Sequence, residues 1–123
     1  MHLYQNNNFE AFLLEENCIY FKYFKNAEIH VEDVEKGFQL HDEFQVTDQV
    51  VRIIHSEQYV SIDKAARELL EHSSRPAKAE AFIIPSLPQK IIFNFYKRVR
   101  RSQHPVRAFD SLDKALYWIK SYL

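Results

Sequence analysis

The stretch QVVRIIHSEQYVSIDKAARELLEHSSRPAKAEAFIIP, residues 49–85, decides the fold class of this chain. It begins with a β-branched run over 49–54 and ends with an apolar run over 79–85, and both are typical of strands buried on both faces. Between them, apolar side chains recur at the i, i+3, i+4, i+7 and i+8 spacing of one helix face: Ile62, Ala65, Ala66, Leu69 and Leu70. A strand, a helix and a second strand in this order predict parallel strands joined by a right-handed crossover.

Two further strands and a helix are predicted upstream of this unit. Residues 9–15 and 18–24 are rich in strand-forming residues, and the short polar link between them contains Asn17, which favours a hairpin. Apolar positions three and four residues apart predict a helix over 31–44. Residues 1–8 are polar and are expected to be disordered.

Two helices and one strand are predicted downstream. Apolar positions predict a helix over about 87–100, and 106–109 is predicted as a short strand. Asp110 or Ser111 then caps a last helix whose expected core face is Leu112, Ala115, Leu116, Ile119 and Leu123. The whole order is β-β-α-β-α-β-α-β-α, an α/β sandwich with a mostly parallel mixed sheet and an N-terminal hairpin, in a single domain over 1–123.

Composition excludes several classes of function. A chain of 123 residues, 46% hydrophobic and 27% charged, is typical of one globular domain. The single glycine, Gly37, excludes phosphate-binding loops and dinucleotide turns, which need several. Gly37 falls inside the predicted 31–44 helix, where close packing is expected to compensate for its low helix propensity. The single cysteine, Cys18, is expected to be a buried apolar residue, and the chain is expected to be cytoplasmic, with no transmembrane segment.

The sequence resembles the STAS fold of sulfate-transporter tails and anti-sigma-factor antagonists across most of its length. The resemblance rests on Ile19-Tyr20-Phe21-Lys22-Tyr23-Phe24, on Ser61-Ile62-Asp63-Lys64-Ala65-Ala66-Arg67, and on Pro105-Val106-Arg107-Ala108-Phe109 followed by Lys114-Ala115-Leu116. It is nearest to small, uncharacterised bacterial domains described as anti-sigma-antagonist-like, or SpoIIAA-like. The resemblance implies the fold more firmly than it implies a function.

The same resemblance raises the question of phosphorylation. Anti-sigma antagonists carry an Asp-Ser-Ser-Gly-like turn before the second helix, and a partner kinase phosphorylates one serine there. This chain has Val60-Ser61-Ile62-Asp63-Lys64 in that region, so the glycine and the paired serines are missing. Ser61 and, less directly, Ser56 are the nearest candidate phosphorylation sites. The favoured interpretation is that Ser61 only caps the helix.

No catalytic, cofactor or metal site is predicted. The six histidines have none of the HxH, HxxxH or HExxH spacings of metal sites: His2, His30, His41, His55, His72 and His104. His55 follows a predicted strand, where sites in α/β sheets often form, but no second member of a catalytic set is visible.

Charge is distributed unevenly along the chain. Residues 1–80 hold eight basic and fifteen acidic side chains, whereas 81–109 hold six basic side chains and no acid. Four of those six cluster at the end of the predicted 87–100 helix, more than the helix dipole requires. Together with two aromatic residues they form a candidate interaction surface: Phe93, Tyr96, Lys97, Arg98, Arg100 and Arg101.

Two functions are consistent with these observations. The first is a non-enzymatic regulatory or protein-interaction domain, which binds a partner protein or a second copy of itself through that surface. Nucleic acid is the weakest candidate partner because the net charge of the chain is −1. The alternative is a domain that binds a small hydrophobic ligand or lipid, with Arg98 or Arg101 at the mouth of the pocket.

Overall fold

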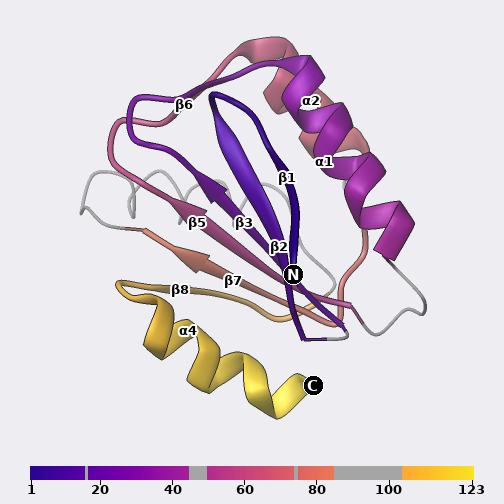
Figure 1. The fold of residues 1–123 in the computed structure, drawn as a ribbon, viewed down its shortest axis with the longest axis vertical. Coiled ribbons are helices and arrows are strands. Elements are labelled where there is room, and N and C mark those ends of the chain that lie inside the picture. The colour runs from indigo at the N-terminus through magenta and orange to yellow at the C-terminus, as the bar shows by residue number, and fades with distance from the viewer. Residues whose placement is uncertain (16, 45–49, 74, 85–103) are drawn as a thin grey trace.

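The structure is a computed structural model, and it describes residues 1–15, 17–44, 50–73, 75–84 and 104–123. Six strands form one sheet in the order β1-β2-β3-β5-β7-β8 (Figure 1). Their bounds are β1 His2–Gln5, β2 Phe9–Glu15, β3 Cys18–Tyr23, β5 Val51–Ser56, β7 Ala79–Ile83 and β8 Val106–Phe109.

The sheet is antiparallel at one edge and parallel over the rest. β1 and β2 pair antiparallel, as do β2 and β3, whereas β3, β5, β7 and β8 pair parallel to one another. Phe12 lies opposite Tyr20 in the hairpin, and Tyr20 lies beside Ile53 in the first parallel pair. The predicted hairpin and the mostly parallel sheet are therefore confirmed.

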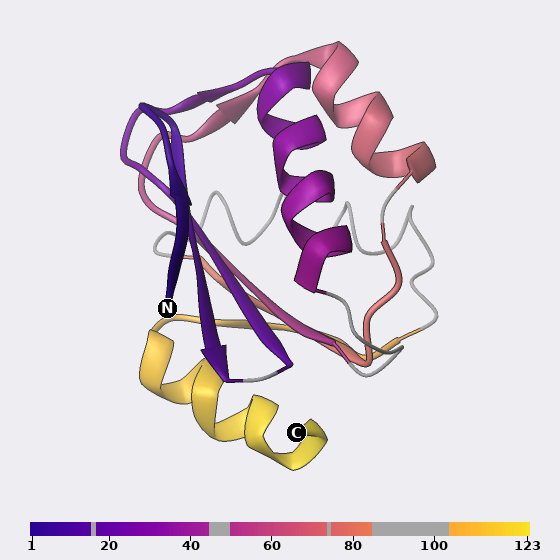
Figure 2. The ribbon, with the colours of Figure 1, turned by 45° about the vertical axis from the view of Figure 1, so that its right-hand side comes forward.

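Helices cover both faces of the sheet. α1 (Val31–Phe44) and α2 (Lys64–Ser73) lie together on one face, and α4 (Leu112–Ile119) lies on the other, ending in the 3-10 turn η1 (Lys120–Tyr122) (Figures 1 and 2). Because β3, β5 and β7 follow one another in a single direction across the sheet, right-handed crossovers put α1 and α2 on the same side. None of the helices in the described ranges is long and apolar enough to span a bilayer.

Alternating strand residues build a separate apolar core on each face. The core on the α4 face consists of Cys18, Tyr20, Val51, Ile53, Ala79, Ala81 and Ile83 with Ala115 and Ile119 of α4. The core on the α1 face consists of Phe9, Ala11, Ile19, Phe21, Leu40 and Val50. Cys18 is fully buried, as expected, and burial followed by the Glu15 charge raises the pKa of its thiol to about 12.

A second, two-stranded sheet lies where β3 and β5 end. It pairs β4 (Glu28–Ile29) with β6 (Ser61–Ile62) in parallel. Beneath it, Ala27, Ile29 and Val34 pack against Ala66, which joins the start of α1 to the start of α2. This small sheet was not predicted because two residues are too few to show an alternating pattern.

Four expectations from the sequence are wrong. Residues 1–8 are not disordered, because β1 pairs with β2 and the Asn6 side-chain oxygen accepts bonds from the Asn8 and Phe9 N–H groups in the connecting turn. The helix expected from Ser61 begins at Lys64, and Ile62 and Ala65, expected on its apolar face, are both exposed. Leu123 is 51% exposed and not part of the core. Among the described residues, a Cβ on Gly37 would meet only the Phe21 ring edge, at an ordinary 3.9 Å, so none of them packs closely enough to require the glycine.

A buried ion pair joins β5 to β7. The Arg52 guanidinium donates to the Glu80 carboxylate and also, over 3.0 Å, to the Arg75 carbonyl oxygen. His104 approaches the second Glu80 oxygen at 3.4 Å. Because both Arg52 and Glu80 are less than a tenth exposed, each buried charge depends on the other for compensation within a largely apolar sheet.

Candidate interaction site at the carboxyl ends of β3 and β5

Two loops meet at the carboxyl edge of the parallel strands. The loop after β3 reaches the loop after β5 through the Asn26 N–H, which donates to the Gln58 carbonyl over 3.0 Å. The Ser61 N–H then donates to the Ala27 carbonyl over 2.9 Å, which begins the β4–β6 ladder. The two loops therefore form one connected surface although they are about thirty residues apart in the chain.

Tyr59 has the most unusual backbone of this surface. Its φ is 62° and its side chain is 69% exposed. Among the described residues only Asn26, with φ 65°, is another non-glycine residue with positive φ. Asparagine tolerates this region, but a bulky residue there loses about 1–2 kcal/mol. Because the Tyr59 ring is exposed, its contacts with the rest of the chain offset little of this strain energy.

Two neighbours complete what we call the Tyr59 surface, which consists of Lys25, Tyr59 and Ile62. The Lys25 ammonium lies 5.9 Å from the centre of the Tyr59 ring, and Ile62 is 37% exposed. An aromatic ring, an aliphatic side chain and a flexible cation thus lie on the same pair of loops. Of these three kinds of side chain, tyrosine is the one enriched in protein interfaces.

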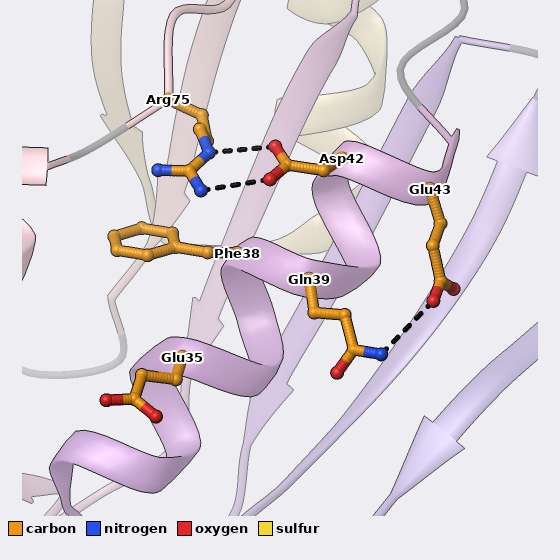
Figure 3. Close-up of a pocket in the computed structure, with 6 residues that line it drawn as sticks. All are labelled: Glu35, Phe38, Gln39, Asp42, Glu43 and Arg75. Atoms are coloured by element: carbon orange, nitrogen blue, oxygen red, sulfur yellow. Dashed lines mark hydrogen bonds and ion pairs between the residues drawn. The ribbon is translucent and has the colours of Figure 1, made fainter.

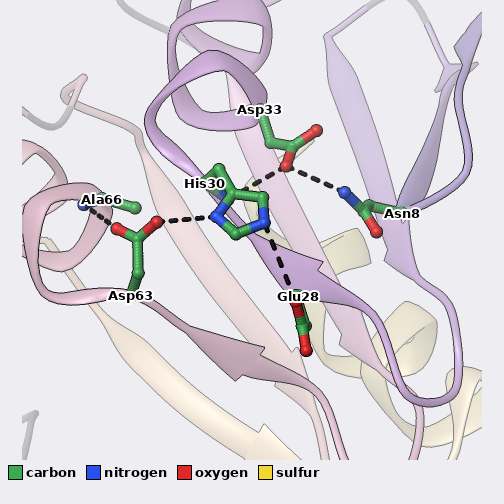
Figure 4. Close-up of polar contacts among 6 residues, drawn as sticks. All are labelled: Asn8, Glu28, His30, Asp33, Asp63 and Ala66. Carbon is green, nitrogen blue, oxygen red and sulfur yellow. Dashed lines mark hydrogen bonds and ion pairs between the residues drawn. The ribbon is translucent and has the colours of Figure 1, made fainter.

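A polar network behind this surface holds the two helix starts in place (Figure 4). The buried Asp33 carboxylate accepts bonds from the His30 N–H at 3.0 Å and from the side chains of Asn6 and Asn8 at 2.9 and 3.0 Å. The Asp63 carboxylate accepts the Ala66 N–H at 2.8 Å and the His30 ring N–H at 2.7 Å. The network therefore ties the β1–β2 turn, α1 and α2 together.

Both Asp63 and His30 favour their charged forms here. The pKa of Asp63 is lowered, first by the bond from the Ala66 N–H and then by His30. The pKa of His30 is raised, first by its bond to Asp63. A carboxylate at a helix N-terminus is favoured by the dipole, so α2 begins with a fixed negative charge.

Asp63, not Ser61, caps α2. Ser61 is exposed in β6, and its backbone N–H is used by the β4 ladder. At the start of α2, the Ala66 N–H is already bonded to the Asp63 carboxylate. The Ser56 hydroxyl donates to the Glu57 carbonyl at 3.1 Å. Phosphorylation of Ser61 or Ser56 stays a prediction.

His55 has a partner that the sequence did not indicate. The Tyr20 hydroxyl lies 2.6 Å from His55 Nδ1 on the α4 face of the sheet. Burial, followed by Lys22, lowers the pKa of His55, and burial, followed by Glu10 and Glu57, raises the pKa of Tyr20 to about 12. Both groups are thus kept neutral near pH 7, which suits a structural bond from the tyrosine O–H to the imidazole.

A shallow hollow lies along α1 (Figure 3). Its volume is about 510 Å³, and it is lined by Glu35, Phe38, Gln39, Asp42, Glu43 and Arg75. Arg75 makes a two-pronged ion pair with Asp42, at 2.8 and 2.9 Å, and its guanidinium lies 4.5 Å from the centre of the Phe38 ring. Among the described residues that line the hollow, Phe38 is the one with an apolar side chain.

The candidate surface predicted from the sequence is not described by the structure. The predicted helix over about 87–100 falls outside the described residues, as do all six of its candidate residues: Phe93, Tyr96, Lys97, Arg98, Arg100 and Arg101. That surface stays a prediction. Within the described ranges, no group of three potential ligands could hold a metal ion.

The fold defines the class of the protein, a small α/β domain with a SpoIIAA-like fold. It matches the crystal structure of an uncharacterized protein from the DUF3478 family of Shewanella loihica PV-4, which is described as SpoIIAA-like, with a TM-score of 0.65. The match covers 94% of this chain and 98% of that one, at 16% sequence identity. The expected STAS-like, SpoIIAA-like fold is therefore confirmed.

The chain belongs to the family described as a domain of unknown function, DUF7793, whose model matches residues 12–123. No curated protein matches the chain.

Proposed function

We propose that this protein is a non-enzymatic, regulatory interaction domain that binds a partner protein through the Tyr59 surface. The single observation that carries the proposal is Tyr59 itself, an exposed aromatic residue in a left-handed backbone conformation. Glycine or asparagine would occupy that conformation with less strain. Strain that is not repaid by internal packing points to a use outside the folded chain.

The neighbouring side chains support a protein as the partner. Tyrosine in a protein interface often contributes more binding energy than its neighbours, because it buries a large rigid ring at little entropic cost. Ile62 adds apolar area, and Lys25 adds a charge at the rim. The lone cysteine suits a reducing compartment, so we place this activity in the cytoplasm.

Enzymatic function is not part of the proposal. The Tyr20 hydroxyl and His55 Nδ1 lie 2.6 Å apart, and we assign this hydrogen bond a structural role. The alternative, a domain that binds a hydrophobic ligand or lipid, stays a prediction.

The test compares binding by the wild type and by two single variants. Tyr59→Asn removes the ring and suits the left-handed backbone, whereas Tyr117→Asn removes an 83% exposed tyrosine from α4, which lies on the opposite face. Each chain is immobilised at equal density, and proteins retained from an extract of the native host are quantified by mass spectrometry. Light scattering on each purified chain reports self-association.

We expect Tyr59→Asn to weaken retention of a specific partner at least about tenfold, and Tyr117→Asn to leave it unchanged. Tyr59→Asn should unfold at the same urea concentration as the wild type or a higher one, because strain is relieved. Equal retention by all three chains would refute the proposal. So would a Tyr59→Asn chain that is clearly less stable, since the ring would then have a structural role.

A further inference from the structure

The outer edge of β6 carries main-chain groups that its own ladder does not use. The Ser61 N–H donates to the Ala27 carbonyl at 2.9 Å, and the Asp63 N–H donates to the Ile29 carbonyl at 3.1 Å. Both N–H groups point toward β4. In a parallel ladder the residue between them points its N–H and C=O the other way, so those of Ile62 face away from β4.

Nothing in the described part of the chain accepts the Ile62 N–H through a backbone hydrogen bond. Both residues of β6 are exposed, and so are Tyr59 just before it and Asp63 just after it. The edge is therefore open to solvent, with an exposed apolar side chain on it and another beside it.

β1, one of the two edge strands of the large sheet, is different. Its register with β2 shifts between His2 and Tyr4. Irregularities of this kind twist an edge strand away from further pairing and are a common protection against it. β6 has no such irregularity in its pairing with β4, and its flanking apolar residues are exposed.

We propose that the partner supplies an extended peptide segment that pairs with the outer edge of β6, as a third strand of the β4–β6 sheet. The Ile62 N–H and C=O bond to the main chain of that segment, and Tyr59 and Ile62 contact its apolar side chains. An extended backbone is the occupant that presents a donor and an acceptor at strand spacing. This inference rests on the proposed function and specifies the chemistry of the partner.

A second copy of the chain fits this edge less well. Pairing two strands of two residues each would bury little beyond Tyr59 and Ile62 of each copy. Stable protein interfaces bury about 1,200 Å² or more in total. A single peptide strand needs no such area, because its main-chain bonds supply much of the affinity.

The experiment selects ligands from a phage-displayed random-peptide library on the immobilised full chain. Hydrogen exchange of the Ile62 amide is then followed by NMR with and without a selected peptide. Two variants accompany it: Ile62→Pro removes the N–H without removing an internal hydrogen bond, and Ile62→Val keeps it. Proline also suits the extended Ser61 that precedes it.

We expect a selected peptide to slow exchange of the Ile62 amide at least about tenfold and Ile62→Pro to weaken binding by a similar factor. Ile62→Val should bind like the wild type. Three results would overturn the inference: no enriched peptide, peptides that leave the Ile62 amide unprotected, or protection of that amide by rising protein concentration alone. The last result would mean self-pairing. If Tyr59→Asn loses its partner while Ile62→Pro keeps it, the proposed function stands and strand pairing fails.

Discussion

His41 gives the sharpest test of how this fold is stabilised. It lies on α1, is 2% exposed, and neither ring nitrogen has a hydrogen-bond partner in the described part of the chain. Burial, followed by the Arg52 charge, lowers the pKa of this imidazole from 6.5 to about 4. The ring is therefore neutral at pH 7, and protonating it would place a second cation near Arg52.

The expected energies follow from burial and from the shift in pKa. A buried polar group without partners costs about 1–3 kcal/mol. His41→Leu has a similar volume and removes that cost, so it should raise the free energy of unfolding near pH 7.5 by about 1 kcal/mol.

Lowering the pH should increase the difference in the free energy of unfolding between His41→Leu and the wild type. Because the pKa is lower in the folded chain, the unfolded chain binds the proton more readily, so stability falls as pH drops below 6.5 and toward 4. At about pH 5 this linkage costs the wild type about 2 kcal/mol, and none of that cost applies to His41→Leu.

The assay is urea unfolding of the wild type, His41→Leu and His72→Leu at about pH 7.5 and about pH 5. His72 is an exposed histidine on α2 and serves as the matched control, expected within about 0.5 kcal/mol of the wild type at both pH values. Other groups with shifted pKa values, such as His55, are present in every protein and cancel in the difference. A His41→Leu advantage that is absent, or equal at both pH values, would refute the reasoning.

Two further predictions concern the ion pairs. Glu80→Gln should lower the free energy of unfolding by about 3–5 kcal/mol, because it leaves the Arg52 charge buried without its carboxylate, and the double variant Arg52→Met with Glu80→Met should lose much less in the same urea assay. Asp63→Asn should keep the cap of α2 but lower the pKa of His30 toward its ordinary value, as measured by NMR titration, whereas Asp63→Ala should also destabilise the fold.

Each of these predictions has a control and a result that contradicts it. If Arg52→Met with Glu80→Met is as unstable as Glu80→Gln alone, the prediction is wrong. The paired charges would then contribute more to the free energy of unfolding than two apolar side chains in their place. For Asp63, the control is Glu28→Gln, because Glu28 is 3.9 Å from the His30 ring and is the weakest of the influences that raise its pKa. An unchanged His30 titration in Asp63→Asn would mean that the bond between these side chains does not form in solution.

Local patterns were sufficient to predict the large elements of the fold. The helix predicted over 31–44 is α1, and the strand predicted over 106–109 is β8. Ser111 does cap α4, with its hydroxyl accepting the Lys114 N–H. These features depend on residues close together in the chain, so their periodicity or capping chemistry is visible without the rest of the molecule.

Features that depend on distant contacts were missed. Ser61 and Asp63 are both good capping residues, and the choice between them is decided by the β4–β6 ladder, which joins segments about thirty residues apart. The positive φ of Tyr59 occurs beside the Asn26–Gln58 bond, again between two loops, and no local pattern marks it.

One missed feature did have a signal. Arg52 and Glu80 are opposite charges inside two apolar runs that were predicted to be parallel neighbours. A charge inside a buried strand needs a partner, and the neighbouring strand is the nearest place to find one. Placing the two runs in register would have predicted the pair.

The Asp63 cap has a consequence for how this end of the molecule can be controlled. Asp63 is an unmodified residue of the chain, so every folded copy carries its negative charge at the start of α2. A phosphatase does not remove it, and no ATP is spent to place it. If a partner binds beside it at the Tyr59 surface, the bound fraction depends on the concentrations of the two proteins and needs no change of charge at this cap.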